Sequence, residues 1–152
     1  MGNNIYTIPI RKLYDEKNDP NMESFISGLK IDLNKKNDYL YPTVLEIKKA
    51  IINVGLKITN EKNENFQKGE GWFCEIKETE KYDTIISVDN IKSKDELITD
   101  IISFPYGKWE TILSVLFELE KTIGPILFYC DSGEMTIVEK NKTIEQVVKE
   151  ME

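Results

Sequence analysis

The stretch GKWETILSVLFELEKTIGPILFYCDSGEMTIVEK, residues 107–140, contains the clearest helical pattern of the chain, followed by the clearest hairpin pattern. Apolar residues recur at helical spacing up to residue 123, and polar residues occupy the opposite side. Gly124-Pro125 ends the helix, because glycine suits the conformation after a helix and proline cannot continue it. We expect Trp109, Ile112, Leu113, Leu116 and Ile123 on the buried side, with Trp109 anchoring the helix, and Glu110, Ser114, Glu118 and Lys121 on the solvent side.

Two strand-like runs follow the helix, PILFYC at 125–130 and EMTIVEK at 134–140. Between them, Asp131-Ser132-Gly133 has the residue types of a turn, because aspartate bonds to its own backbone and glycine supplies a positive φ. A cysteine or serine nucleophile would need a base, most often histidine, and the chain has none. Cys130 also ends an apolar run, where desolvation raises the pKa of a thiol. We interpret Cys130-Asp131-Ser132 as the corner of a hairpin.

Helical signals also occur in three other segments. Asp19-Pro20 is typical of an N-cap and first helical residue, which predicts a short helix to about Gly28. The segment PTVLEIKKAIINVG, residues 42–55, has apolar residues at helical spacing and ends at a glycine. Thr143 and Gln146 predict a capping box at the start of a last helix, about 143–151.

The remaining segments read as strands and loops. Residues 4–10 predict a short strand, in which Pro9 suggests an edge position. Residues 72–78 and 84–90 predict two strands joined by a tight turn near Tyr82-Asp83. Residues 93–104 fit a helix with a Ser93/Glu96 capping box or a strand, and their Ile and Thr content favours the strand. We expect 30–41 to be irregular and 59–71 to be a hairpin loop.

This order of elements predicts the fold class. Groups of adjacent strands separated by helices indicate an α+β protein with a mainly antiparallel sheet, covered by helices on one face. The length of 152 residues fits a single domain, residues 1–152. Cys74 and Cys130 lie in apolar surroundings and are expected to be buried free thiols.

The negative charge of the chain is unevenly distributed. The net charge is −7; residues 1–76 contain 11 basic and 11 acidic residues, and residues 77–152 contain 9 and 16. Such a surface repels nucleic acid phosphates and anionic membranes, and it attracts a basic protein. We therefore expect a protein partner with a basic surface, no nucleic acid and no membrane.

Candidates for catalysis and cofactor binding are weak. KGEGWFC, residues 68–74, precedes a strand, whereas phosphate-binding loops open a helix. Two cysteines without histidine do not make the usual zinc site. Asp95-Glu96 and Glu118/Glu120 are expected to be solvated carboxylates. We predict a non-enzymatic protein without cofactor or metal, and an enzyme that uses carboxylates alone stays open.

Two further patterns bear on the compartment. No apolar run approaches the roughly 18 residues of a membrane span, and the first residues lack the pattern of a secretion signal. The sequence therefore predicts a cytoplasmic protein.

Two stretches, FPYGKWETI (104–112) and GPILFYCDSGEMTIVE (124–139), together with the size and acidity of the chain, resemble small bacterial immunity proteins. Such proteins neutralise a cognate polymorphic or contact-dependent toxin. The resemblance covers roughly residues 71–140, matches no defined immunity family, and transfers no site residue. It implies that an acidic surface covers the basic active site of a toxin.

The charge distribution suggests four residues for partner binding. Glu110 and Glu118 lie two turns apart on the solvent side of the predicted main helix, and Asp131 and Glu134 flank the hairpin tip. We predict these four as the partner-binding residues. The alternative function is an accessory domain that binds a small molecule or a peptide in a groove between sheet and helices.

Overall fold

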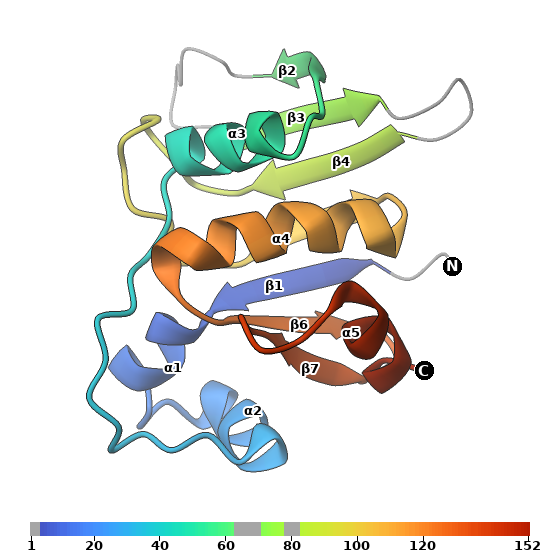
Figure 1. Ribbon diagram of the computed structural model, residues 1–152. Coiled ribbons are helices and arrows are strands. Elements are labelled where there is room, and N and C mark those ends of the chain that lie inside the picture. The colour runs from blue at the N-terminus through green and yellow to red at the C-terminus, as the bar shows by residue number, and fades with distance from the viewer. Residues whose placement is uncertain (1–3, 63–70, 78–82) are drawn as a thin grey trace.

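The computed structural model describes residues 4–62, 71–77 and 83–152, which form an antiparallel sheet with helices on both faces (Figure 1). In the described residues the sheet has seven strands in the order β2-β3-β4-β5-β1-β6-β7, and every neighbouring pair is antiparallel. The predicted α+β class with a mainly antiparallel sheet is confirmed. The strands are β1 (Ile5–Pro9), β2 (Ile58–Lys62), β3 (Trp72–Lys77), β4 (Asp83–Val88), β5 (Ile102–Tyr106), β6 (Ile126–Cys130) and β7 (Met135–Val138).

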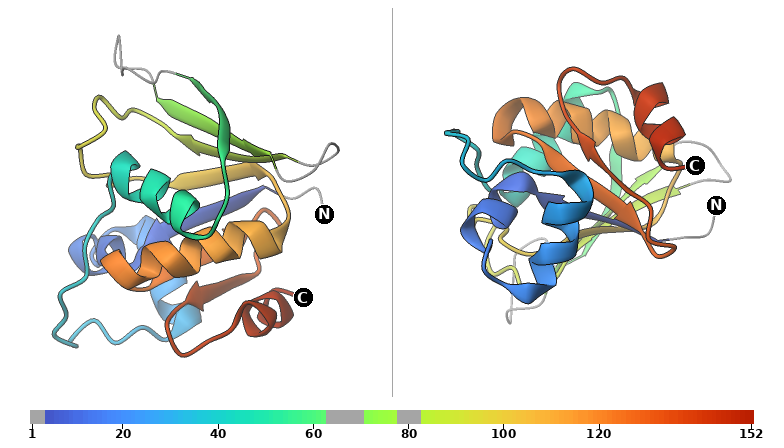
Figure 2. Two further views of the ribbon diagram at one scale, coloured as in Figure 1. Left: turned by 45° about the horizontal axis from the view of Figure 1, so that its top comes forward. Right: turned by 90° about the horizontal axis from the view of Figure 1, so that it is seen from below.

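The prediction that helices cover one face is wrong. Helices α3 (Val44–Asn53), α4 (Trp109–Ile123) and α5 (Ile144–Glu150) pack on one face, and α1 (Ile10–Asp15) and α2 (Pro20–Leu29) lie on the other (Figure 2). The physical reason lies in β1 and β6, whose side chains are buried on both sides. Ile5 and Phe128 belong to the main core, and Ile8 and Leu127 belong to a second core with α1 and α2.

The first strand is central, which corrects its predicted edge position. β1 pairs with β5 from Ile5 to Thr7 and with β6 from Ile5 to Pro9. Pro9 therefore lies beyond the end of the β5 pairing, at a position where the missing N–H disturbs the ladder least. A proline at the last residue of a strand is compatible with a central position.

Residues 91–101 are irregular, so the predicted strand at 93–104 is wrong except for its end. Backbone hydrogen bonds from Ile98 N to Pro42 O (2.7 Å) and from Leu45 N to Lys94 O (3.3 Å) hold this segment against the start of α3. Ile91 and Ile98 are buried there. Their apolar character thus reflects packing of a loop, and only Ile102–Tyr106 forms a strand, β5.

The predicted loop 59–71 is also corrected, because residues 58–62 form β2, the outer strand beside β3. Residues 63–70 lie outside the described residues. The predicted turn near Tyr82-Asp83 lies partly outside them as well, and Asp83 is already the first residue of β4.

The locally encoded helices are confirmed. The Asp19 carboxylate accepts from Asn21 N at 2.9 Å and caps α2, while Thr43 and Thr143 form capping boxes at α3 and α5. Helix α4 matches its prediction, with Ile112, Leu113, Leu116 and Ile123 buried and Trp109 only partly buried. Helix α1 was not predicted.

The hairpin of β6 and β7 turns where the sequence predicts. Gly133 has a φ of 96°, its N–H donates to Cys130 O at 3.0 Å, and Cys130 N donates to Glu134 O at 3.2 Å. Cys130 and Cys74 are both buried and free, as predicted.

Candidate functional site

Among the described residues, helix α4 borders three hollows on the surface. On one side, α3 and α4 enclose a narrow polar groove, here the α3–α4 groove, of about 170 Å³. A wider groove of about 460 Å³, the α4–α5 groove, contains Glu110, Ile144, Glu145, Val148, Lys149 and Glu152. At the end of the helix a third hollow of about 440 Å³, the C-terminal pocket, is lined by Tyr39, Leu40, Glu120, Gly124 and Lys140 among others.

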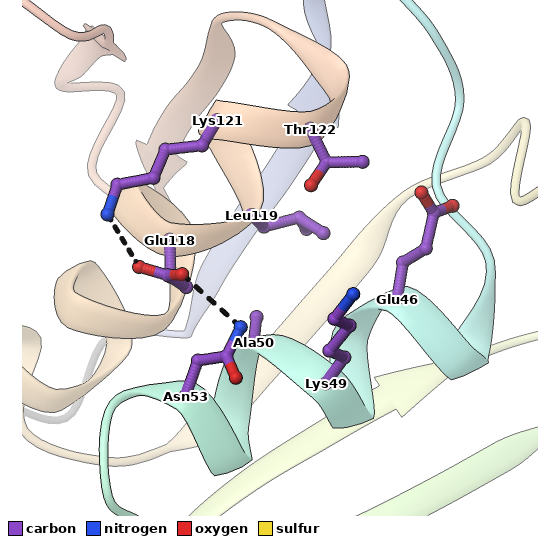
Figure 3. A pocket seen from close by; sticks show the side chains of 8 residues that line it. All are labelled: Glu46, Lys49, Ala50, Asn53, Glu118, Leu119, Lys121 and Thr122. Atoms are coloured by element: carbon purple, nitrogen blue, oxygen red, sulfur yellow. Dashed lines mark hydrogen bonds and ion pairs between the residues drawn. The ribbon is translucent and has the colours of Figure 1, made fainter.

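In the α3–α4 groove, the carboxylate of Glu118 joins the two helices (Figure 3). It accepts from Lys121 Nζ at 2.9 Å and, at 3.4 Å, from Asn53 Nδ2 on α3. The hydrogen bond from Lys121 lowers the pKa of Glu118. This predicted partner-binding residue is thus ionised and already paired, so its charge is matched within the groove.

The α4–α5 groove holds another predicted residue, Glu110, in the first turn of α4. The structure brings Glu145 and Glu152 beside it, and Lys149 is the single basic residue of the lining. Ile144 and Val148 supply the apolar part of the groove and pack partly against the main core. The groove therefore combines three carboxylates with an apolar floor.

Helix α5 is held in place by its cap and by its apolar face. Thr143 Oγ1 accepts from Gln146 N at 3.2 Å, and Thr143 N donates to Gln146 Oε1 at 2.8 Å. Val147 is fully buried. Lys142 pairs with Glu150 at 3.2 Å and with Glu139 at 3.6 Å.

The hairpin tip presents the last two predicted residues, Asp131 and Glu134, both exposed. Asp131 Oδ2 accepts from Asn4 N at 3.2 Å. Glu134 Oε2 accepts from the Ser132 hydroxyl and, at 3.3 Å, from Cys130 Sγ. These hydrogen bonds, the one from Ser132 foremost, lower the pKa of Glu134. A carboxylate with a lowered pKa is a weak base and a stable negative charge.

The structure places three of the four predicted partner-binding residues at one end of the molecule and the fourth in a different groove. The β6–β7 turn, α5 and the start of α4 lie at the same end of the sheet (Figure 1). Asp131, Glu134 and Glu110 therefore belong to one end of the molecule. Glu118 lies in the α3–α4 groove, so Glu110 and Glu118 do not line one groove.

Sequence reasoning missed the contribution of α5. Glu145 and Val148 are three residues apart, which places them on one side of a helix, and Glu152 follows four residues later, just beyond the end of α5. That spacing is a signal for a shared helix face. It carries no information on the neighbour of that face, because the packing of α5 beside α4 depends on tertiary contacts.

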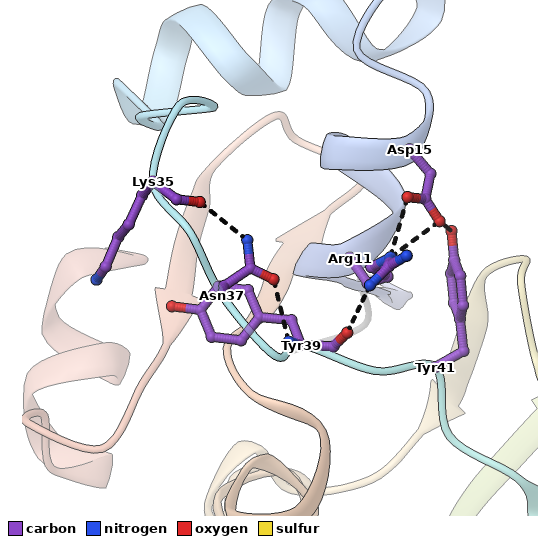
Figure 4. A network of polar contacts seen from close by, with 6 residues as sticks. All are labelled: Arg11, Asp15, Lys35, Asn37, Tyr39 and Tyr41. Atoms are coloured by element: carbon purple, nitrogen blue, oxygen red, sulfur yellow. Dashed lines mark hydrogen bonds and ion pairs between the residues drawn. The ribbon is translucent and has the colours of Figure 1, made fainter.

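The C-terminal pocket depends on the irregular segment 30–43, which is fastened to α1 (Figure 4). Arg11 Nε donates to Asp15 Oδ1 at 3.0 Å, and Arg11 Nη1 donates to Tyr39 O at 3.1 Å. The Tyr41 hydroxyl donates to Asp15 Oδ2 at 2.9 Å. Burial, and secondarily this hydrogen bond, raises the pKa of Tyr41. Two of these contacts, Arg11 to Tyr39 and Tyr41 to Asp15, hold the segment against α1, and Arg11 and Asp15 are bonded to each other.

Neither a metal centre nor a membrane-spanning helix occurs among the described residues. Within residues 4–62, 71–77 and 83–152, no group of three or more cysteine, aspartate and glutamate side chains is placed to hold a metal ion. In the same part of the chain, no helix is long and apolar enough to cross a membrane.

Comparisons with known proteins found no matching family model, no matching curated protein and no matching solved structure. The resemblance to immunity proteins therefore stays a prediction from the sequence.

Proposed function

We propose that this chain is a non-enzymatic binding protein, an immunity protein that neutralises a cognate bacterial toxin by covering its basic active site. The observation that supports the proposal is the α4–α5 groove, in which Glu110, Glu145 and Glu152 surround an apolar floor. A basic protein surface needs both features: carboxylates to pair with lysine and arginine, and apolar area that is removed from water.

The hairpin tip extends this acidic surface. Asp131 and Glu134 lie at the same end of the sheet as the groove, and neither is paired with a basic side chain among the described residues. Charge of one sign gathered at one end speeds the encounter with a basic partner, and this effect weakens as salt rises.

The test requires the partner itself, which the proposal expects to be a basic toxin encoded by a neighbouring gene; finding such a gene is the first step. One variant combines Glu110→Lys with Glu145→Lys in the groove, and a second combines Asp131→Lys with Glu134→Lys at the tip. We expect each to weaken the complex by about 2–5 kcal/mol where the charges are desolvated, or mainly to slow association where they lie on the rim. Rescue of growth in cells that produce the toxin should fail in parallel.

The matched control reverses two exposed charges elsewhere, Glu23→Lys with Asp95→Lys, which gives the same net charge. This control should bind within about twofold of wild type at moderate salt, because exposed charges far from the interface contribute little. If both test variants bind like the control, and association does not depend on salt, the proposed occlusion by acidic residues is wrong.

A further inference from the structure

The C-terminal pocket is lined by a largely buried glutamate, Glu120. Glu120 is only 8% exposed, which corrects the expectation of a solvated carboxylate, and no hydrogen bond or ion pair of its carboxylate occurs among the described residues. Burial without such partners raises the pKa of Glu120. No buried side-chain oxygen of these residues lacks a hydrogen-bond partner, so the small exposed part of Glu120 includes its carboxylate oxygens. The oxygens of Glu120 are therefore reached through the pocket, where a ligand with N–H donors can bind them.

The neighbouring basic residues Lys140 and Lys121 compensate this charge only in part, because neither is paired with Glu120 among the described residues. Lys121 is engaged on another side of α4, where its Nζ lies 2.9 Å from Glu118. Lys140, on the rim of the pocket, is exposed and attracts Glu120 only at longer range. Glu139, which adds negative charge near Glu120, is itself paired with Lys142 at 3.6 Å.

The end of α4 adds backbone acceptors to the same pocket. The last carbonyl groups of a helix have no partner within the helix and form the negative end of its dipole. Gly124 N donates to Glu120 O at 2.9 Å, but residue 125 is a proline and has no N–H for the carbonyl of Lys121. Lys121 and Thr122 both line the pocket. The end of α4 therefore adds carbonyl acceptors close to the Glu120 carboxylate.

The walls of the pocket are fixed before any ligand arrives. Leu40 N donates to Ile123 O at 3.0 Å, which ties segment 30–43 to the end of α4. The Tyr39 ring lies against Gly124, where a Cβ atom would stand 2.4 Å from Tyr39 Cδ1. The contacts of Arg11 hold the same segment from the other side (Figure 4). A preformed pocket loses little entropy on binding.

We propose that the C-terminal pocket binds a guanidinium group, with Glu120 as its carboxylate acceptor and the last carbonyl groups of α4 as additional acceptors. A guanidinium group is planar, always charged and carries five N–H donors, so it can satisfy a carboxylate and backbone carbonyls together. The Tyr39 side chain adds an aromatic wall, which favours such a cation. The proposal is independent of the toxin-binding function, because this pocket shares no lining residue with the α4–α5 groove.

The guanidinium group can come from an arginine side chain of a protein or from a free small molecule, and two probes distinguish these sources. N-acetyl-arginine amide represents the side chain within a polypeptide, and free arginine represents the small molecule. N-acetyl-citrulline amide has nearly the same shape without the charge. Each is titrated into the 15N-labelled full chain, and the amide resonances of residues 38–40 and 120–124 are followed.

We expect saturable shifts at these residues with at least one guanidinium probe, at about millimolar affinity or better, and none with the citrulline probe. Glu120→Gln should weaken binding about tenfold or more, because hydrogen bonds to charged groups are the strong ones. Lys140→Gln should strengthen it, because the competing cation is removed. Stronger binding of free arginine assigns the site to a small molecule, and stronger binding of the amide assigns it to a protein side chain.

The matched control is Glu145→Gln, which removes the same charge from the α4–α5 groove and should bind the probes like wild type. Three results would overturn the proposal: no localised shifts with either guanidinium probe up to about 10 mM, equal shifts with the citrulline probe, or unchanged binding by a folded Glu120→Gln variant. None of them bears on toxin binding, which is tested with other residues.

Discussion

Glu118 and Glu120 are two residues apart on α4, yet their side chains have opposite electrostatic environments. Two residues advance a helix by more than half a turn, so one carboxylate faces α3 and the other faces the C-terminal pocket. Lys121 lowers the pKa of Glu118, whereas burial raises the pKa of Glu120. The sequence alone therefore does not predict which of two neighbouring acidic residues is available to bind a ligand.

The raised pKa of Glu120 predicts that Glu120→Gln stabilises the protein at pH 7. The native state disfavours the charged carboxylate more than the unfolded chain does, so wild type gains stability as pH falls through the raised pKa. The advantage of the variant should therefore disappear in acid. Urea unfolding between pH 3 and pH 7 measures this (about 1 kcal/mol is resolvable by linear extrapolation). Equal urea midpoints of wild type and Glu120→Gln at every pH would contradict the predicted desolvation of Glu120.

The thiol of Cys74 predicts a loss of stability in alkali. Burial raises its pKa from 9.0 to about 12. As pH rises above 9, the unfolded chain ionises this thiol and the native protein does not, so the free energy of unfolding falls by about 1.4 kcal/mol per pH unit until the native pKa is reached. Cys74→Ala should show a shallower slope between about pH 9 and 11, with matching slopes below pH 8. Identical slopes in alkali would show that Cys74 ionises normally.

At the scale of elements, the two tryptophans differ more than the sequence suggests. Trp72 on β3 is 1% exposed, and its Nε1 donates to Glu61 Oε2 at 2.8 Å. Trp109 is only partly buried and contacts Phe128 edge-on, with the ring centroids 6.0 Å apart. Trp72 is therefore more deeply buried than Trp109. It shares the anchoring role that the sequence assigns to Trp109.

We therefore predict that Trp72→Ala costs about 3–5 kcal/mol, because it leaves a cavity and removes a hydrogen bond to Glu61, which keeps its ion pair with Lys48. Trp109→Ala should cost about 1–3 kcal/mol, because less area is removed from water. Urea denaturation of both variants measures the difference. A larger loss for Trp109→Ala would reverse this ranking.

The capping boxes give a matched pair of element-scale variants. Thr43→Ala and Thr143→Ala each remove one side-chain acceptor from a helix start, and we expect each to cost about 0.5–2 kcal/mol. Hydrogen exchange should locate the losses, with reduced protection in α3 for the first and in α5 for the second. Uniform loss of protection in both variants would mean that the caps act only on global stability.

These elements also show what a sequence can and cannot predict. Caps, periodic apolar residues and turn residues act within a few positions, so α2, α3, α4, α5 and the β6–β7 hairpin were predicted. The central place of β1, the irregular 91–101 segment and the second layer of helices depend on contacts between remote segments. The same holds for the candidate site. The sequence identifies solvent-side carboxylates at Glu110, Glu118, Asp131 and Glu134. It does not predict that α5 lies beside Glu110, because that neighbour is set by tertiary packing.

At the scale of the whole molecule, helix α4 separates regions with different chemistry. Its first turn borders an acidic groove with an apolar floor, and its last turn borders a pocket with one buried carboxylate. The proposed protein-binding surface and the proposed guanidinium pocket therefore lie at different ends of one rigid element. Variants of one region can be examined without altering the other.

The central position of β1 has a consequence for synthesis on the ribosome. Asn4 and Asp131, which are hydrogen-bonded in the native protein, are 127 residues apart in the chain. β1 leaves the exit tunnel early and stays unpaired on both sides until β5 and β6 have emerged. Such long-range pairing is slow and leaves nascent chains open to aggregation. Stalled nascent chains of increasing length should generate folding force in one late step, after β6 has cleared the tunnel. A step of folding force before β5 emerges would show that a part of the sheet folds without its middle strand.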